Sequence, residues 1–148
     1  MKQHFAQQTN YTCGSASMRI ALAQLGINVS EKKMEAMLKT NKIRGTWHKA
    51  FPIVAEHYKL NYMVSRNSTL QALKDALQQG YTIIVCYLYP PQKVDHYAVI
   101  NNIGRTYIYF LDPFWGRHHR HSIAHFTKIW KSDPKYEHQQ SWFIGIKK

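Results

Sequence analysis

The hydrophobic period changes halfway along this chain, and that change restricts its fold more than any other feature. In the first half, apolar residues recur at the three-to-four spacing of buried helix faces. This spacing predicts four helices. The first covers 13–25, the second begins after a cap at Ser30, the third covers 47–58, and the fourth runs from a cap at Asn67 or Ser68 to Gln79. A short strand is predicted over 60–64.

The second half is dominated by β-branched and aromatic runs, which favour strands. Strands are predicted over 81–89, which Pro90 and Pro91 end, then over 96–103, 106–111 and 141–146, with a turn at 102–105 and a helix over 122–130. Helices followed by antiparallel strands form the α+β pattern. Because no repeat or long linker interrupts it, residues 1–148 are expected to form a single domain.

Charge is the unusual part of the composition. The chain has 20 Lys and Arg against 8 Asp and Glu, a formal net charge of +12. Such an excess favours an acidic partner, whether a peptide, a nucleic acid or a membrane surface. The basic residues are scattered and no RNA-recognition or zinc-finger signature accompanies them, so specific nucleic-acid binding is not expected.

No segment has the pattern of a signal peptide or of a membrane span. The amino terminus is polar, and the longest apolar run, 83–88, is far below the about 20 residues that cross a bilayer. These observations predict a cytoplasmic protein. They are equally compatible with a domain cut from a larger one.

The two cysteines allow one reactive thiolate but neither a disulfide framework nor a Cys-rich zinc site. Cys13 stands at the predicted start of the first helix, where free backbone N–H groups and the helix dipole favour a thiolate. The alternative is that Cys13 is a small buried hydrophobe. Cys86 lies in mid-strand between Val85 and Tyr87 without a basic neighbour, and is predicted to be an inert core residue.

A nucleophilic cysteine needs a base and a group that orients the base. His96 begins one predicted strand and Asp112 ends the next, so across the turn at 102–105 the two are nearly opposite. An Asp in that place accepts from one imidazole nitrogen and leaves the other for a thiol. The simpler interpretation of each residue alone is a surface loop histidine for His96 and a turn-forming aspartate before Pro113 for Asp112. Together they predict a triad with Cys13.

Acyl transfer also needs hydrogen-bond donors aimed at the developing oxyanion. The backbone N–H of Cys13 is one candidate donor. The side-chain amide of Gln7 or of Gln8 is the second.

The run Arg117–His121 is the densest cationic segment of the chain. Adjacent histidines rarely converge on one ion and no carboxylate or thiol is near, so neither a metal site nor a cofactor is predicted. We expect a solvated loop beside the catalytic end, which could attract an acidic peptide. Phe114 and Trp115, just before it, either form a cleft wall or serve core packing or loop anchoring.

These residues resemble the papain-like family of bacteriocin-processing cysteine peptidases, which comprises double-glycine leader peptidases and their stand-alone relatives. In the segment Gln7–Ala16 the family has Gln, five residues, Cys, Gly, any residue and Ala. The segments 95–100 around His96 and 109–113 around Asp112 are similar to its other two motifs. The family spacing between Gln and Cys selects Gln7 over Gln8.

The resemblance implies a papain-like α+β fold, in which a helical half carrying the Cys packs on an antiparallel sheet carrying His and Asp. It implies peptide-bond hydrolysis through a thioester acyl-enzyme. Cys13 is then the nucleophile, His96 the general acid and base, Asp112 the orienting carboxylate and Gln7 the oxyanion donor. Thr12 stands where transporter-borne members usually have Asp, which favours the stand-alone branch.

Two other functions stay open at this point. One is a non-cleaving module that binds a leader peptide or a partner protein on the same fold. The other is a thiol acyltransferase with an amine acceptor, because a triad alone does not choose the acceptor. In each case the expected partner is a peptide or protein, and the net charge favours an acidic one.

Overall fold

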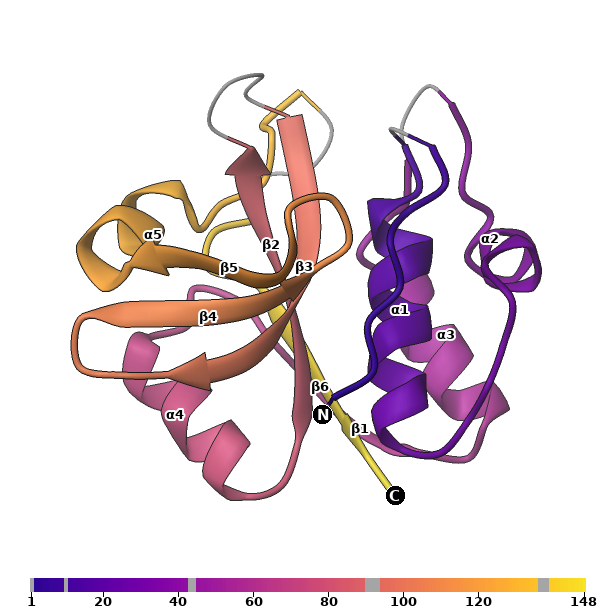
Figure 1. Ribbon diagram of the computed structural model, residues 1–148, viewed down its shortest axis with the longest axis horizontal. Coiled ribbons are helices and arrows are strands. Elements are labelled where there is room, and N and C mark those ends of the chain that lie inside the picture. The colour runs from indigo at the N-terminus through magenta and orange to yellow at the C-terminus, as the bar shows by residue number, and fades with distance from the viewer. Residues whose placement is uncertain (1, 10, 43–44, 90–93, 136–138) are drawn as a thin grey trace.

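The fold is a mixed helix-and-sheet structure in which helices cover both faces of one sheet (Figure 1). The computed structural model describes residues 2–9, 11–42, 45–89, 94–135 and 139–148. Pro90 and Pro91, predicted to end a strand, and Asn10 of the cysteine motif lie outside the described residues.

The described residues form five helices and six strands. The helices are α1 (Cys13–Gln24), α2 (Glu31–Leu38), α3 (Ala50–His57), α4 (Leu70–Gln78) and α5 (Ile123–Ile129). The strands are β1 (Asn61–Ser65), β2 (Thr82–Tyr89), β3 (Val94–Ile103), β4 (Tyr107–Asp112), β5 (Gly116–Ser122) and β6 (Phe143–Lys147). All neighbouring strands are antiparallel, in the order β1-β6-β2-β3-β4-β5. This confirms the predicted α+β class.

The start of α4 differs from the prediction, whereas the start of α2 does not. Ser30 caps α2, as the sequence predicts. The cap of α4 is Thr69, and not Asn67 or Ser68. Those two residues instead donate their backbone N–H groups to the carbonyls of residues 140 and 141, just before β6. This tertiary pairing keeps them out of the helix.

β5 is the element that the sequence misses. The run 117–121, predicted as a solvated loop, lies inside β5 and pairs with β4 at the edge of the sheet. β5 begins directly after the turn with Gly116, whose φ of 109° suits a residue without a Cβ atom. The loop prediction is wrong because an edge strand keeps one side open to water and so can carry a polar sequence.

Each face of the sheet has its own hydrophobic core. α1, α2 and α3 contribute to one core, and α4 and α5 to the other (Figure 1). Successive residues of β2 alternate between the two, with Ile84 and Cys86 in the first and Val85 and Tyr87 in the second. Cys86 is 1% exposed, as expected for a core cysteine.

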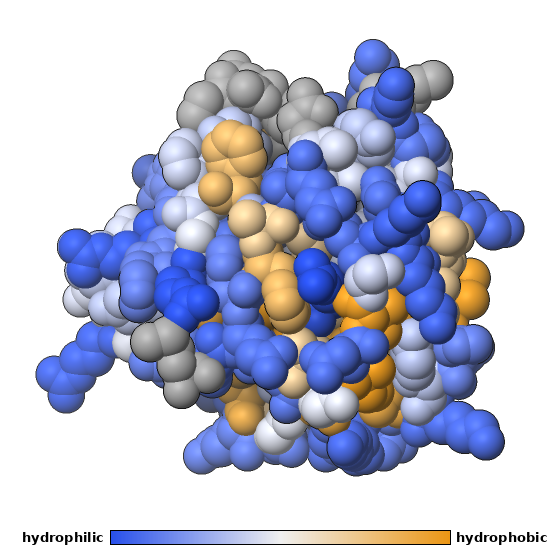
Figure 2. All heavy atoms as spheres, turned by 45° about the vertical axis from the view of Figure 1, so that its right-hand side comes forward, coloured by the Kyte–Doolittle hydropathy of each residue, from blue (hydrophilic) through white to orange (hydrophobic). Residues whose placement is uncertain are grey.

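The surface is mostly hydrophilic on the side shown in Figure 2, with apolar side chains gathered in smaller patches. Within the described ranges, the helices are all too short or too polar to cross a bilayer.

Gly14, the second residue of α1, lies against Thr46 and has no room for a side chain. A Cβ atom at Gly14 would stand 2.5 Å from the Thr46 Oγ1 atom. Thr46 is 2% exposed and is hydrogen-bonded through that atom to the Thr40 hydroxyl at 2.7 Å, so it cannot easily move.

We expect Gly14→Ala to lower the free energy of unfolding by about 1–3 kcal/mol because of this overpacking. Urea denaturation measures the change. Gly104→Ala is the control, since its Cβ atom would meet nothing closer than 3.5 Å. Equal effects of the two substitutions would contradict the steric explanation.

Candidate active site

Three side chains from separate elements meet where the start of α1 faces the sheet. Cys13 begins α1, His96 lies in β3 and Asp112 ends β4. The His96 Nε2 atom is 2.8 Å from Asp112 Oδ1, and the Cys13 side chain is also hydrogen-bonded to His96. Because Asp112 occupies Nε2, Nδ1 is the ring nitrogen left for the thiol. Cys13, His96 and Asp112 therefore form one continuous hydrogen-bonded chain.

His96 and Asp112 are diagonal neighbours, not opposite ones. β3 and β4 pair as far as Ile103 and Ile108, so the turn lies further along the chain than the predicted 102–105. Because Val99 pairs with Leu111, Asp112 stops two residues short of the position opposite His96. Diagonal neighbours on one sheet face are about 7–8 Å apart at Cα, which long side chains still span.

The Asp112 carboxylate is completely buried and accepts hydrogen bonds from four donors. Oδ1 accepts from His96 and from the backbone N–H groups of Phe114 and Trp115, each at 2.9 Å. Oδ2 accepts from the Tyr87 hydroxyl at 2.8 Å. Burial by itself raises the pKa of Asp112, but these donors and the His96 charge outweigh it and lower the pKa. The carboxylate is therefore held as an anion.

His96 is 5% exposed, yet its environment favours the charged ring. Burial lowers the pKa of His96, but hydrogen bonds to Asp112 and Cys13 and the charges of both raise it to about 10. An imidazolium beside Cys13 stabilises a thiolate there, and the thiolate is the nucleophilic form. The site can thus hold a nucleophile and a transferable proton in contact.

Tyr87 also belongs to this site, although the sequence marks it only as a strand residue. It pairs with His96 in the β2–β3 register, and the two ring centroids are 5.2 Å apart. Burial, followed by the charge of Asp112 and the hydrogen bond to it, raises the pKa of Tyr87 well above its usual value. The hydroxyl therefore stays protonated and serves as a donor. The period-two alternation of a strand could have placed Tyr87 on the same side of the sheet as His96. It could not have identified Asp112 as the hydrogen-bond partner of Tyr87.

Gln7 lies on the segment that passes the turn after β4. Its backbone N–H donates to the Pro113 carbonyl at 2.9 Å. Its side-chain Nε2 donates to the Thr9 carbonyl at 2.6 Å, which leaves one amide hydrogen for another acceptor. The backbone N–H of Gln8 is instead bound to the Glu31 carboxylate at 2.9 Å. The structure therefore places Gln7, rather than Gln8, against the strand end that carries Asp112.

The backbone at the start of α1 has N–H groups that the helix itself leaves without acceptors, and they lie beside the thiol. The first intrahelical hydrogen bond is the one from the Ala16 N–H to the Thr12 carbonyl, at 2.9 Å. The N–H groups of residues 13–15 therefore have no acceptor within the helix. Such groups can stabilise negative charge on the sulfur or on a bound oxyanion.

Tyr89, Phe114 and Trp115 form an aromatic ridge beside His96. Tyr89 stacks on Trp115 with centroids 5.3 Å apart, and Phe114 stands edge-on to Tyr89 at 5.5 Å. Phe114 and Trp115 are 52% and 45% exposed. This exposure argues against core packing, whereas the stacking of Trp115 on Tyr89 and His119 fits an anchored loop as well as a cleft wall.

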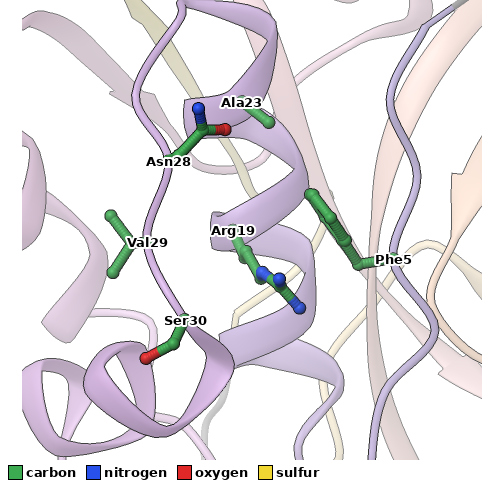
Figure 3. A pocket seen from close by; sticks show the side chains of 6 residues that line it. All are labelled: Phe5, Arg19, Ala23, Asn28, Val29 and Ser30. Carbon is green, nitrogen blue, oxygen red and sulfur yellow. The ribbon is translucent and has the colours of Figure 1, made fainter.

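A separate cavity of about 250 Å³ lies between the N-terminal segment, α1 and the chain that leads to α2 (Figure 3). Its lining residues are Phe5, Arg19, Ala23, Asn28, Val29 and Ser30. The Arg19 guanidinium stacks on the Phe5 ring at 3.7 Å. None of the three hydrogen-bonded site residues lines this cavity, so it is distinct from the candidate active site.

Comparison with known proteins assigns the chain to a family. The sequence profile of the Peptidase C39 like family matches residues 2–138. The chain therefore belongs to this family, which confirms the resemblance noted in the sequence. No curated protein sequence gave a significant match.

Several solved structures share the fold at low sequence identity. The peptidase domain of Streptococcus ComA, a bi-functional ABC transporter involved in a quorum sensing pathway, has a TM-score of 0.78 and 19% identity, covering 99% of this chain and 98% of that one. A putative C39-like peptidase from Bacillus anthracis has a TM-score of 0.79 and 12% identity, covering 99% and 94%. A double glycine motif protease from an AMS/PCAT transporter, solved in complex with the leader peptide, has a TM-score of 0.72 and 15% identity, covering 97% and 89%. These likenesses confirm the papain-like peptidase fold.

We expect the His96 ring to stay protonated at pH 8, and Asp112→Asn to lower the pKa of His96 by about 1–3 because it removes the neighbouring charge. A histidine NMR titration measures this. The folded chain binds the His96 proton more tightly than the unfolded one, where histidine titrates near 6.5. The His96 contribution to the free energy of unfolding is therefore complete below about pH 6.5 and is lost as the pH rises through about 10.

The control for this titration is Asp75→Asn, which removes an exposed carboxylate from α4. It should leave the His96 titration unchanged. A His96 pKa that is the same in Asp112→Asn as in the wild type would contradict the described coupling.

Proposed function

We propose that this chain is a cysteine peptidase that hydrolyses a peptide bond through a thioester acyl-enzyme, with Cys13 as nucleophile. The observation that carries the proposal is the hydrogen-bonded chain from Cys13 through His96 to Asp112 at the start of α1. Membership of the Peptidase C39 like family and the fold of peptidase domains support the same class of enzyme.

Acylation begins when the Cys13 thiolate attacks the carbonyl carbon of the scissile peptide bond. The imidazolium of His96 then donates its Nδ1 proton to the leaving nitrogen, the C–N bond breaks and the amine product departs. Asp112 keeps the ring oriented and stabilises its positive charge throughout. The enzyme is left as a thioester at Cys13 with a neutral His96.

Deacylation uses the same groups in reverse. Neutral His96 accepts a proton from water, which attacks the thioester carbonyl. Loss of the thiolate releases the carboxylic acid product and restores the imidazolium beside Cys13. No further group is needed to balance the reaction.

The oxyanion that forms in each step requires donors. We assign this role to the backbone N–H of Cys13 and to the remaining amide hydrogen of Gln7. The N–H groups at the start of α1, which have no acceptor within the helix, support the first assignment. The position of Gln7 against Pro113 supports the second.

The substrate is a peptide or protein segment, and three observations restrict it. The exposed aromatic ridge beside His96 offers a surface for an apolar side chain near the scissile bond. The net charge of +12 favours acidic residues elsewhere in the substrate. A structural relative, a double glycine motif protease, was solved in complex with the leader peptide, so cleavage after Gly-Gly is the specificity to test first.

Residues 1–148 act, in this proposal, as a single peptidase domain. Both cores include residues from the two halves of the sequence, which supports one folding unit. The cytoplasmic location stays a prediction from the sequence.

We expect the wild-type chain to cleave peptides with a central Gly-Gly and acidic flanks, and Cys13→Ala to lose about 10³-fold or more of that rate because the nucleophile is gone. Mass spectrometry of the products measures cleavage and identifies the acceptor. Cys86→Ala is the matched control, since it removes the buried cysteine and should retain the activity.

Two outcomes would contradict hydrolysis at Cys13. One is equal loss of activity in Cys13→Ala and Cys86→Ala when both remain folded. The other is transfer of the acyl group to added amines with no free carboxylic acid product, which would make the chain an acyltransferase.

A further inference from the structure

The outer strand β5 brings two histidines together outside the candidate active site. His119 and His121 are two residues apart on the strand, so they lie on the same side of the sheet, and both are half-buried. Their Nε2 atoms are hydrogen-bonded to each other at 3.1 Å, so one ring donates and the other accepts. The neighbouring positions on the other side of the strand, His118 and Arg120, are exposed.

This separation matches two ligands of one metal ion. Two imidazole nitrogens at about 2.0–2.1 Å from a tetrahedral Zn²⁺ are about 3.3 Å apart, and about 2.9 Å apart when the angle between them is square. The ring centroids of His119 and His121 are 4.6 Å apart and the planes are nearly perpendicular, at 86°. A linear N–H···N hydrogen bond would separate the centroids by about 5.4 Å. The rings are therefore bent away from the linear arrangement, and a shared ion would take the place of the hydrogen-bonded proton between the two nitrogens.

A third imidazole lies next to this pair. His125, in the first turn of α5, is exposed, and its ring centroid is 5.2 Å from that of His121. As the side chains stand, no three metal-ligating groups of the described residues converge on one ion. His125 therefore has to turn to become a ligand, which its exposure permits.

The pair is held in place by its neighbours, as the ligands of a metal site usually are. The His119 ring stacks on Trp115, with centroids 5.5 Å apart and an angle of 18°. The His121 ring meets the edge of Tyr87 at 5.3 Å. Tyr87 in turn donates to Asp112, so the pair is one side chain away from the candidate active site.

We propose that His119, His121 and His125 form a binding site for a borderline transition-metal cation, Zn²⁺ in the first instance, with water in the fourth position. The argument from the sequence against a metal site applies to adjacent histidines. His119 and His121 are alternate residues of a strand and therefore lie on one side of it. Since the three ligands come from β5 and α5, binding would tie the edge strand to the helix that packs beside it.

The test titrates ZnCl₂ into Cys13→Ala by isothermal calorimetry. This background is needed because a thiolate next to an imidazole is itself a zinc ligand pair. We expect one site per chain, and affinity weakened by about tenfold or more in His119→Gln, in His121→Gln and in His125→Gln. His118→Gln, on the opposite side of the same strand, is the matched control and should bind as tightly as the parent.

A second measurement keeps the proposal testable if a variant folds poorly. Co²⁺ added to folded Cys13→Ala should give the visible absorption bands of imidazole coordination, and Zn²⁺ should displace it. The proposal is overturned if Cys13→Ala binds no zinc, if His118→Gln weakens binding as much as His119→Gln, or if His125→Gln leaves the affinity unchanged. The cleavage assay is independent of each of these outcomes.

Discussion

The buried carboxylate of Asp112 is the charge around which the sheet end is organised. A carboxylate without solvent contact is stable only when its oxygens are satisfied, and here the donors come from β2, from β3 and from the turn after β4. The N-terminal segment is hydrogen-bonded to the backbone at the same place. The His4 ring lies 2.7 Å from the Asp112 carbonyl oxygen, and the backbone N–H of Gln7 donates to the Pro113 carbonyl. The anion therefore fixes His96 and Tyr87, and the backbone next to it holds the segment that carries Gln7.

Cys13 reaches His96 because a separate set of contacts, away from Asp112, holds the helices against the sheet. Thr46 fills the space over Gly14, and its carbonyl accepts from the hydroxyl of Tyr97 in β3 at 2.8 Å. The same hydroxyl is hydrogen-bonded to the buried His48 ring, which stacks on Trp142. These contacts fix the start of α1 relative to β3, so that the thiol of Cys13 meets the Nδ1 edge of the His96 ring.

The sequence predicts the parts of the fold that depend on local pattern. The start of α1 at Cys13 and the two strands that carry His96 and Asp112 follow from periodicity. The parts that depend on partners are missed. β5 is polar because it is an edge strand, the cap of α4 is displaced by pairing near residue 140, and the hydroxyl of Tyr87 finds Asp112 only in three dimensions. The convergence of His119 and His121 likewise requires the strand that their composition hides.

The central claim is that His96 holds Cys13 as a reactive thiolate. The most direct measurement is peptide mapping by mass spectrometry after brief exposure to iodoacetamide at pH 6. At that pH an ordinary thiol, with a pKa of about 8.5, is almost wholly protonated. The account predicts rapid modification of Cys13, slow modification of Cys86 and loss of the Cys13 reaction in His96→Gln. Preferential labelling of Cys86, or equal labelling of Cys13 with and without His96, would contradict it.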